Sequence, residues 1–402
     1  MFPSQCEDTI LRDNPLFRFI YDYASSLLPC WLSYVLAGVT IMLILINAVL
    51  LGAAVVSWME RRLLGRFQNR IGPNRWGPFG LLQPIADLFK LITKEDLIPA
   101  GADRIAFTLV PIIMVASLIL MAAVIPFAKD TSLVDLNVGV LYLLAISSLT
   151  SIALFTAGWA SDNRYALFGT ARSVAVLISY EVPVVLSLLG VVMIVGSMSL
   201  SSIVEFQSVP FIVVQPLAFF VFLAGMSAEL NRTPFDLAEA ESEIIAGYHT
   251  EYSGIKFALI QAAEFGGVLV VSALITTLFL GGWAGPWEDY LGWAWFMGKT
   301  LLIVAVFSWI RATFPRLRID QIMAFSWKVM LPLSLINLAA TTVEVYVLKS
   351  GGITTLELWI MAIINLVLAG VCLPLFGRLM KDKVRKTNPL GVSQSLRDDP
   401  TG

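Results

Sequence analysis

The chain has 402 residues, of which 57% are apolar and only 14% are charged, and its mean hydropathy is +0.80. Soluble domains carry roughly 45–50% apolar and about 25% charged residues, so this composition excludes an ordinary soluble protein and favours lipid as the solvent. The net charge of −2 excludes the basic surface that nucleic-acid-binding proteins need, and we expect no nucleic-acid partner.

Long apolar runs recur along the chain, and each is long enough to cross a membrane, because about 20 residues of helix cover a hydrocarbon core of roughly 30 Å. We expect residues 1–31 to form an outer N-terminal segment, 32–377 a transmembrane helical domain, and 378–402 a polar cytoplasmic tail. The sequence therefore predicts an all-α polytopic membrane protein with about nine transmembrane helices, at 32–57, 105–128, 138–160, 173–199, 210–230, 257–281, 293–312, 322–348 and 355–377.

The basic residues are distributed unevenly about these spans. With an odd number of spans the termini lie on opposite sides, and placing the N-terminus outside puts 22 of the 27 lysines and arginines in cytoplasmic segments. Cytoplasmic loops carry the excess of Lys and Arg in membrane proteins. We therefore predict a multi-pass protein of a bacterial inner membrane, with its N-terminus outside and its C-terminus in the cytoplasm.

Two segments after the first span have unusual composition. Residues 58–80 hold five arginines and four glycines, which indicate a shaped, non-helical connection whose planar guanidinium groups suit carboxylates or a carbonyl ligand; the simpler interpretation is positive-inside anchoring. Residues 79–93 place apolar side chains at helical spacing, with Asp87 and Lys90 between them. This stretch is too short and too charged to span, so we predict an amphipathic surface helix.

A third segment, residues 229–251, is strongly acidic. Thr233 and Pro234 resemble a helix start, with Thr as the N-cap. Asp236, Glu239 and Glu243 would then share one helical face, and we expect the pKa of at least one of these carboxyl groups to rise toward neutrality. Such coupled acids can exchange protons, although a solvated acidic loop is the alternative. In the predicted organisation the acidic cytoplasmic loop extends over 229–256.

Acids within the spans indicate function more strongly. Glu181 and Glu264 fall inside predicted helices, where an ionised carboxylate costs at least about 2.5–3.5 kcal/mol, so each must be protonated, paired or hydrated. Pro183 is expected to loosen the turn beside Glu181. Glu344 lies near the end of a span and is expected only to snorkel outward. Arg311, Arg316 and Arg318 are expected to compensate the acidic loop.

Three cysteines and one histidine exclude most redox centres from this chain. Iron–sulfur clusters normally take four cysteines and haem usually takes a histidine, and there is no C-x-x-C pair for zinc. Cys6 and Cys30 could form a bridge only on an oxidising side of the membrane. We expect no metal or flavin here, so any electron carrier belongs to a partner.

Four long strings resemble the quinone-site membrane subunit of respiratory complex I, in the NADH-quinone oxidoreductase family. They are ERRLLGRFQNRIGPNRWGPFGLLQPIADLFKLITKED at 60–96, GWASDNRYALFGTARSVAVLISYEVP at 158–183, AELNRTPFDLAEAESEIIAGYHTEYSG at 228–254, and RATFPRLRIDQ at 311–321. The likeness extends over nearly the whole chain. Typical members have eight spans, and the ninth predicted here, 355–377, matches a variant.

The resemblance implies a subunit of NADH:quinone oxidoreductase, a translocase, that takes quinone as its substrate. It implies partners among the soluble quinone-site subunits and the antiporter-like membrane subunits, besides the lipid. The implied quinone-tunnel residues are Arg61, Arg62, Asp87, Lys90, Arg232, Asp236, Arg311 and Arg316. The implied proton-transfer residues are Glu181, Glu229, Glu239, Glu241, Glu243, Glu251 and Glu264.

The hypothesis is that quinone reduction changes the protonation of the loop carboxylates and that the change passes to the acids in the spans. Two alternatives stay open. One is the anchor subunit of a related membrane-bound hydrogenase, although the string at 60–96 fits the quinone enzymes better. The other is a secondary cation/proton antiporter, although no internal repeat is found.

Overall fold

A computed structural model of the chain describes residues 14–26, 29–129, 131–236, 247–348 and 354–386. Within these ranges eight helical stretches are long and apolar enough to cross a membrane. They are α2 (Cys30–Phe67), α4 (Arg104–Val124), α5 (Gly139–Ala160), α6 (Arg164–Val195), α11 (Gly254–Phe279), α12 (Glu288–Thr313), the run from α13 (Ile319–Phe325) to α14 (Leu331–Leu348), and α15 (Thr355–Lys386).

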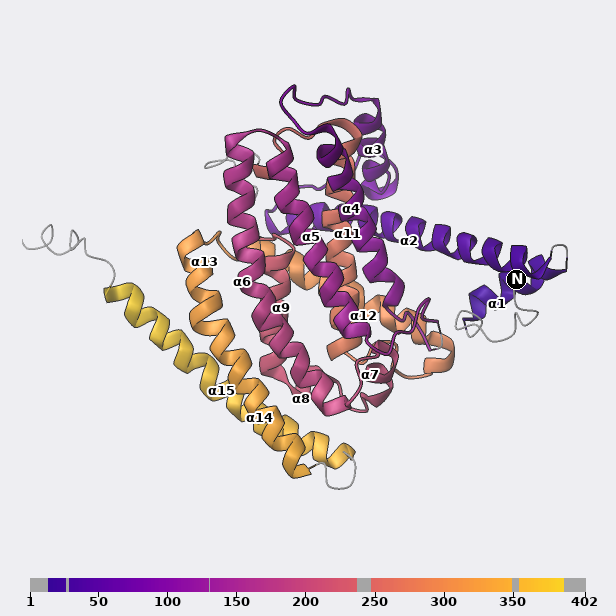
Figure 1. The fold of residues 1–402 in the computed structure, drawn as a ribbon. Coiled ribbons are helices and arrows are strands. Elements are labelled where there is room, and N and C mark those ends of the chain that lie inside the picture. The colour runs from indigo at the N-terminus through magenta and orange to yellow at the C-terminus, as the bar shows by residue number, and fades with distance from the viewer. Residues whose placement is uncertain (1–13, 27–28, 130, 237–246, 349–353, 387–402) are drawn as a thin grey trace, which may run out of the picture.

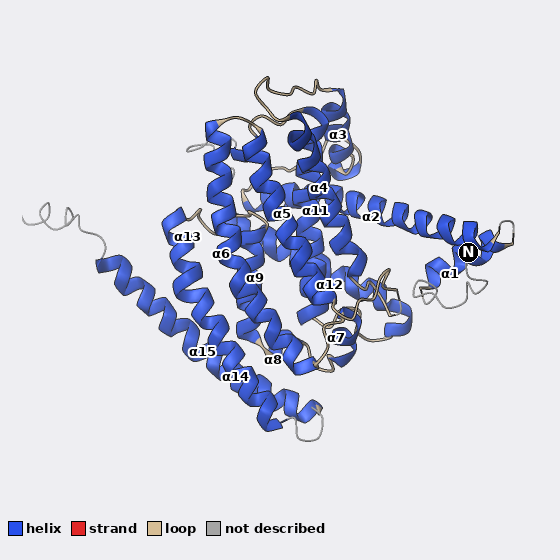
Figure 2. Ribbon diagram, viewed as in Figure 1, coloured by secondary structure: helices blue, strands red, loops and turns tan. Residues whose placement is uncertain are grey.

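Shorter elements complete the described part of the chain, and Figure 2 shows only helices and loops there. They are the helices α1 (Pro15–Ser25), α3 (Gln83–Thr93), α7 (Leu200–Phe206), α8 (Phe211–Val214) and α9 (Pro216–Glu229), the 3-10 turns Pro78–Gly80 and Gly247–His249, and the π-helical stretch Ser326–Met330 between α13 and α14. With α9 as the ninth apolar helix, the predicted all-α polytopic fold is confirmed.

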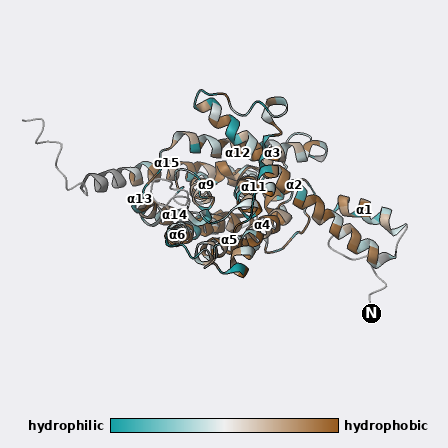
Figure 3. Ribbon diagram, turned by 90° about the horizontal axis from the view of Figure 1, so that it is seen from above, coloured by the Kyte–Doolittle hydropathy of each residue, from teal (hydrophilic) through white to brown (hydrophobic). Residues whose placement is uncertain are grey.

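The bundle has two distinct ends, and α11 lies near its middle. Figure 1 shows α3 at one end, called the α3 end, and α7 and α8 at the other, called the α8 end. Helix α11 packs against α2, α4 and α12. It is apolar around its circumference, as a helix surrounded by other helices must be. Figure 3 shows α11 enclosed while α2 carries apolar residues out beyond the bundle.

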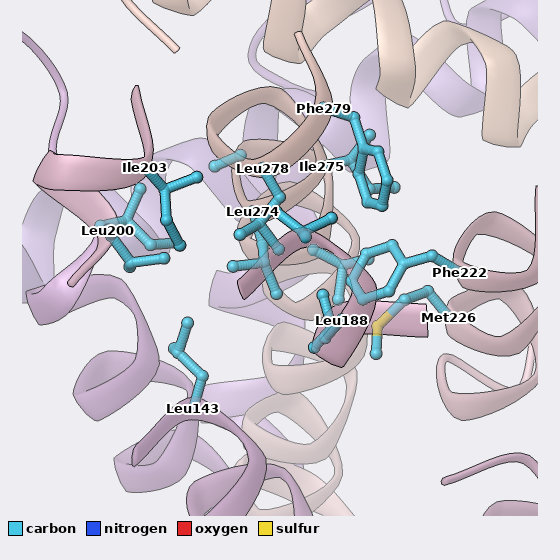
Figure 4. Close-up of a cluster of buried hydrophobic side chains, with 14 of the residues drawn as sticks. Leu143, Leu188, Leu200, Ile203, Phe222, Met226, Leu274, Ile275, Leu278 and Phe279 are labelled. Carbon is cyan, nitrogen blue, oxygen red and sulfur yellow. The ribbon is translucent and has the colours of Figure 1, made fainter. Parts of the chain in front are cut away.

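The largest apolar cluster fills the half of the bundle near the α8 end. Leu188 of α6, Phe222 of α9 and Phe279 of α11 are each no more than 3% exposed and point into this cluster, which Figure 4 shows. The side chains labelled in Figure 4 come from α5, α6, α7, α9 and α11. This packing holds α9 against α11. It thereby positions Glu229, the last residue of α9.

Helix α2 is longer than the predicted span 32–57. Its 38 residues rise by roughly 57 Å at 1.5 Å per residue, well beyond a hydrocarbon core of about 30 Å. In Figure 1, α2 runs across the direction of α5 and α6, and it contacts α3 through the ion pair of Arg61 and Asp87. The extension past residue 57 is stabilised because Glu60 and Arg61 find charged partners on other elements.

The predicted span 210–230 is interrupted. Helix α8 ends at Val214, and α9 begins at Pro216 after Gln215, which has φ −130° and ψ 66°. Proline lacks a donor and disfavours helical geometry in the residue before it, which explains the break.

The last two spans form a hairpin on one side of the bundle, drawn in orange and yellow in Figure 1. Helix α15 runs to Lys386, so the first part of the predicted polar tail 378–402 is helical. Glu344 of α14 was expected to snorkel, and this was wrong: it is 7% exposed and accepts a hydrogen bond of 2.9 Å from Asn365 Nδ2 of α15.

Candidate functional site

A buried glutamate joins three segments at the α3 end. Glu60 of α2 is 5% exposed and accepts hydrogen bonds of 2.8 and 3.0 Å from Arg232 Nη1, which follows α9, and another from Arg311 of α12. The Arg232 guanidinium also lies 4.8 Å from the centre of the Phe265 ring of α11. We call Glu60, Arg232 and Arg311 the Glu60 hub; it has one more positive than negative charge.

Beside the hub is a cavity of about 240 Å³ between α2, α3 and α11. Its lining is mostly apolar, and its polar end is closed by an ion pair of 2.6 Å between Arg61 Nη1 of α2 and Asp87 Oδ2 of α3. Gln83 Nε2 donates to the other Asp87 oxygen at 3.2 Å. The cavity can therefore hold a flat apolar ring and offer Arg61 to an oxygen on that ring.

Of the eight residues assigned to the tunnel from the resemblance, only Arg61 and Asp87 line this cavity, and Arg232, Asp236, Arg311 and Arg316 lie outside its lining, as do Arg62 and Lys90. Arg62 donates to the Phe79 carbonyl at 2.7 Å and lies over the Phe79 ring, so it holds the turn before α3. Lys90 is exposed on α3.

A second cavity, of about 100 Å³, lies between α4, α5, α6, α9 and α11. Two carboxylates line it: Glu229, the last residue of α9, and Glu264 of α11. The Tyr248 hydroxyl, from the 3-10 turn before α11, donates a hydrogen bond to Glu264. Glu229 also interacts with Ser147 of α5. The structure thus brings together two of the predicted proton-transfer acids, and we call this space the acid cavity.

Glu181 extends the same group of acids. It lies on α6 and interacts electrostatically with Glu229, although it does not line the acid cavity. Helix α6 continues through Pro183 from Arg164 to Val195. Glu229 therefore interacts with Glu181 and shares the acid cavity with Glu264.

Consecutive residues of α11 serve the two cavities. Glu264 lines the acid cavity, whereas Phe265 lines the cavity under α3 and stacks on Arg232. Successive residues of a helix point about 100° apart. Arg232 and Arg311 of the hub interact electrostatically with Glu264. The charged groups beside the cavity under α3 therefore act electrostatically on Glu264 in the acid cavity.

The described ends of the acidic segment are fixed to other elements. Arg316 Nη2 lies 3.9 Å from Asp236 Oδ1, so the expected compensation by the basic segment is confirmed for Asp236. Residues 233–235 form a turn, so the helix start predicted at Thr233 and Pro234 is wrong. The turn is closed by the Phe235 N–H, which donates to the Arg232 carbonyl at 2.8 Å.

Beyond residues 237–246 the chain is anchored again. Glu251 accepts a hydrogen bond of 2.6 Å from Asn163, away from the acid cavity. Tyr252 is 5% exposed and stacks on Phe107 with ring centres 4.1 Å apart; burial raises the pKa of its phenol, which stays neutral at physiological pH. The predicted proton-transfer residues Glu239, Glu241 and Glu243 lie outside the described residues.

Sequence reasoning missed Glu60, Tyr248 and Phe265. Glu60 stands directly before Arg61 in the arginine-rich segment, and its position as the segment's single acid was a usable signal. Nothing in the sequence singles out Tyr248 or Phe265, because their roles depend on partners from other helices. Among the residues that the structure describes, no group of three or more His, Cys, Asp or Glu side chains could hold a metal ion.

Comparison with known proteins gives concordant results. A family model described as NADH dehydrogenase matches residues 39–342. The chain is 56% identical over 306 residues to the H subunit of NADH-quinone oxidoreductase from Dehalococcoides mccartyi (strain CBDB1), an alignment that covers 76% of this chain and 86% of that relative. It is 50% identical over 307 residues to the corresponding protein of Brevibacillus brevis, covering 75% and 91%. The resemblance inferred from the four strings is confirmed, and the chain belongs to the family of NADH-quinone oxidoreductase H subunits, which are membrane subunits of complex I.

Proposed function

We propose that this chain walls the quinone-binding cavity of a proton-pumping NADH-quinone oxidoreductase and couples quinone reduction to proton translocation. The observation that carries the proposal is the placement of Phe265 and Glu264, neighbours on α11, in two adjacent cavities. One cavity suits the quinone and the other holds the acids. The electrons arrive from a partner subunit.

The cavity under α3 has the properties that a quinone requires. Its lining includes Leu50 of α2 and Phe265 of α11 and is mostly apolar, with a few polar groups. This is the usual composition of small-ligand sites. Ser57, Gln261 and Arg61 offer donors that a quinone carbonyl can accept from. The apolar exposed side of α3, which includes Phe89 and Ile92, would face the acyl chains from which a lipid-soluble substrate enters.

The coupling follows from charge. Reduction of a quinone by two electrons produces negative charge that about two protons neutralise. That negative charge attracts Arg61 and the surplus positive charge of the Glu60 hub, and it alters the field at Glu264. Because interactions between charges are strong where water is excluded, a small shift of Arg232 changes the preference of Glu264 for a proton.

From Glu264 the route continues through described acids. Glu229 shares the acid cavity, and Glu181 lies within electrostatic reach of Glu229, toward the antiporter-like membrane subunits that we expect as partners. The soluble quinone-site subunits would close the α3 end. The uneven distribution of basic residues supports an outer N-terminus and a cytoplasmic C-terminus, in a bacterial inner membrane.

The proposal is tested by filling the cavity under α3. Ala54 lines this cavity on α2, and A54W places an indole where the quinone ring would lie. In membranes that contain the assembled complex, A54W should raise the KM for a short-chain quinone at least tenfold. Electron transfer from NADH to a soluble artificial acceptor should be unchanged.

The matched control is L51W on the same helix, because Leu51 is 63% exposed and does not line the cavity. It should leave the KM for quinone within twofold of the parent value. Equal quinone kinetics in A54W and the parent complex, with the variant subunit incorporated, would remove this cavity from the quinone path.

A further inference from the structure

A second group of buried polar side chains, none of which lines the acid cavity, lies in the half of the membrane near the α8 end. Helix α14 carries Asn337, Thr341 and Glu344 at spacing i, i+4 and i+7, so the three share one face. Gln215 Nε2, from the break between α8 and α9, donates to Thr341 Oγ1 at 3.0 Å. Asn365 of α15 donates to Glu344.

These side chains are buried, yet several of their polar atoms are unpartnered. Gln215, Asn337, Thr341 and Asn365 are 0% exposed and Glu344 is 7% exposed. The atoms without a hydrogen-bond partner in the protein are Gln215 Oε1, Asn337 Oδ1 and Nδ2, Glu344 Oε1 and Asn365 Oδ1. Buried polar atoms are nearly always satisfied, so a group of this kind indicates a bound ligand.

The chemistry of the unpartnered atoms selects the ligand. A metal ion would satisfy the oxygens but not the Asn337 Nδ2 donor. Water donates and accepts, so it can satisfy both kinds of atom. Gly190 of α6 makes room for the group: a Cβ there would lie 3.2 Å from Gln215 Oε1 and 3.3 Å from Asn337 Nδ2.

Lys349, the basic residue nearest to Glu344 in the sequence, lies outside the described residues. Among the described residues no lysine or arginine forms an ion pair with Glu344, and residues 182–199 and 211–228 of the neighbouring helices contain no ionisable side chain. On α15 the neighbouring acid is Glu357, which accepts from the Thr354 N–H at 2.6 Å, and on α14 Tyr346 is 86% exposed. A carboxyl group buried in this way must be protonated, paired or hydrated.

We propose that Glu344, Asn365, Asn337, Thr341 and Gln215 form a hydrated proton-binding site in the half of the membrane near the α8 end. The protonated form carries its proton on Glu344 Oε1, the free oxygen, which donates it in a hydrogen bond to a cluster water, while Oε2 continues to accept from Asn365. The ninth span thereby acquires a chemical role, because α15 supplies the amide that orients the carboxyl group. This site stands apart from the proposed quinone cavity and does not depend on it.

The test uses infrared difference spectroscopy of the assembled complex in membranes during a change of pH. A protonated carboxyl group gives its own C=O stretching band, which shifts when H₂O is replaced by D₂O. E344Q should remove one such band. E357Q is the matched control, because Glu357 is an acid at the start of α15 outside the cluster, and it should leave that band in place.

Two further measurements make the outcome decisive. N365L should move the band that E344Q removes, because the carboxyl group loses its amide donor, and replacement of Na⁺ by choline should leave that band unchanged. The proposal fails if assembled E344Q keeps every carboxyl band, if the band depends on Na⁺, or if it ignores D₂O. If E344Q does not assemble, an unmoved carboxyl spectrum in N365L also overturns it.

Discussion

At the scale of single residues, the Glu60 hub shows how this chain stabilises buried charges at the α3 end of the bundle. One carboxylate, 5% exposed, binds two guanidinium groups from segments 172 and 251 residues away. Removal of one member of a buried ion pair leaves the other members desolvated and uncompensated, at a cost of about 3–5 kcal/mol. The hub is therefore sensitive to loss of its acid.

We expect E60Q to lower the stability of the assembled complex, because Arg232 and Arg311 would keep their charges without a counterion. The change should appear as a lower midpoint of thermal inactivation and as less complex in the membrane. E205Q is the control, since Glu205 is an exposed acid on α7.

The double variant E60Q/R311Q isolates the electrostatic cause. It removes one positive charge together with the negative one, so it should recover part of the stability that E60Q loses. A double variant less stable than E60Q alone would show that the hub acts through shape rather than charge.

The sequence could predict which types of residue form the site, but not which residues pair with one another. Acids within apolar spans stand out, which is why Glu181 and Glu264 were identified. The partners of a charge come from distant helices, so the sequence could not pair Arg232 with Glu60 or Tyr248 with Glu264. Glu344 was misjudged for the same reason, because its partner Asn365 lies on the next helix.

At the scale of elements, apolar runs located the eight candidate spans of the described residues and the shorter helix α9, whereas helix ends depended on tertiary contacts. The apolar run 32–57 ends where the hydrocarbon core of the membrane is expected to end. Helix α2 nevertheless continues to Phe67, because Glu60 and Arg61 are paired with charged residues of other elements. Pro216 was a usable signal for the break between α8 and α9, since proline restricts the residue before it. The prediction did not use this signal, because the apolar run 210–230 is long enough to read as one continuous span.

The surface helix α3 gives a prediction at this scale. Phe89 is 64% exposed and belongs to the apolar face, whereas Lys90 is its exposed polar neighbour. With native cysteines replaced, a spin label at F89C should collide with dissolved oxygen, which concentrates in lipid. A label at K90C should collide with a water-soluble nickel complex. Equal exposure of both labels to the nickel complex would mean that α3 does not lie in the membrane surface.

At the scale of the whole molecule, the basic residues predict the orientation, and the structure supplies positions that can test it. Tyr290 at the start of α12 is 86% exposed, and Leu97 between α3 and α4 is 60% exposed. Leu97 follows α3, which Figure 1 shows at the α3 end, whereas Tyr290 stands at the end of α12 opposite to Arg311 of the Glu60 hub.

In intact cells, a membrane-impermeant maleimide should label Y290C in the assembled complex and should leave L97C unlabelled. In inverted membrane vesicles the pattern should reverse. Labelling of L97C from outside would contradict the orientation that the lysines and arginines predict.

The length of α9 has an electrical consequence. Its 14 residues rise by only about 21 Å, against a hydrocarbon thickness of about 30 Å. Polar groups stand at both of its ends, Glu229 at one and Gln215 at the other. Where water reaches such groups from either side, the membrane voltage falls across the shorter distance between them, and the local field is steeper than elsewhere in the bilayer. Moving an elementary charge across the whole membrane costs about 2.3 kcal/mol for each 100 mV. Most of that energy would then be needed along α9.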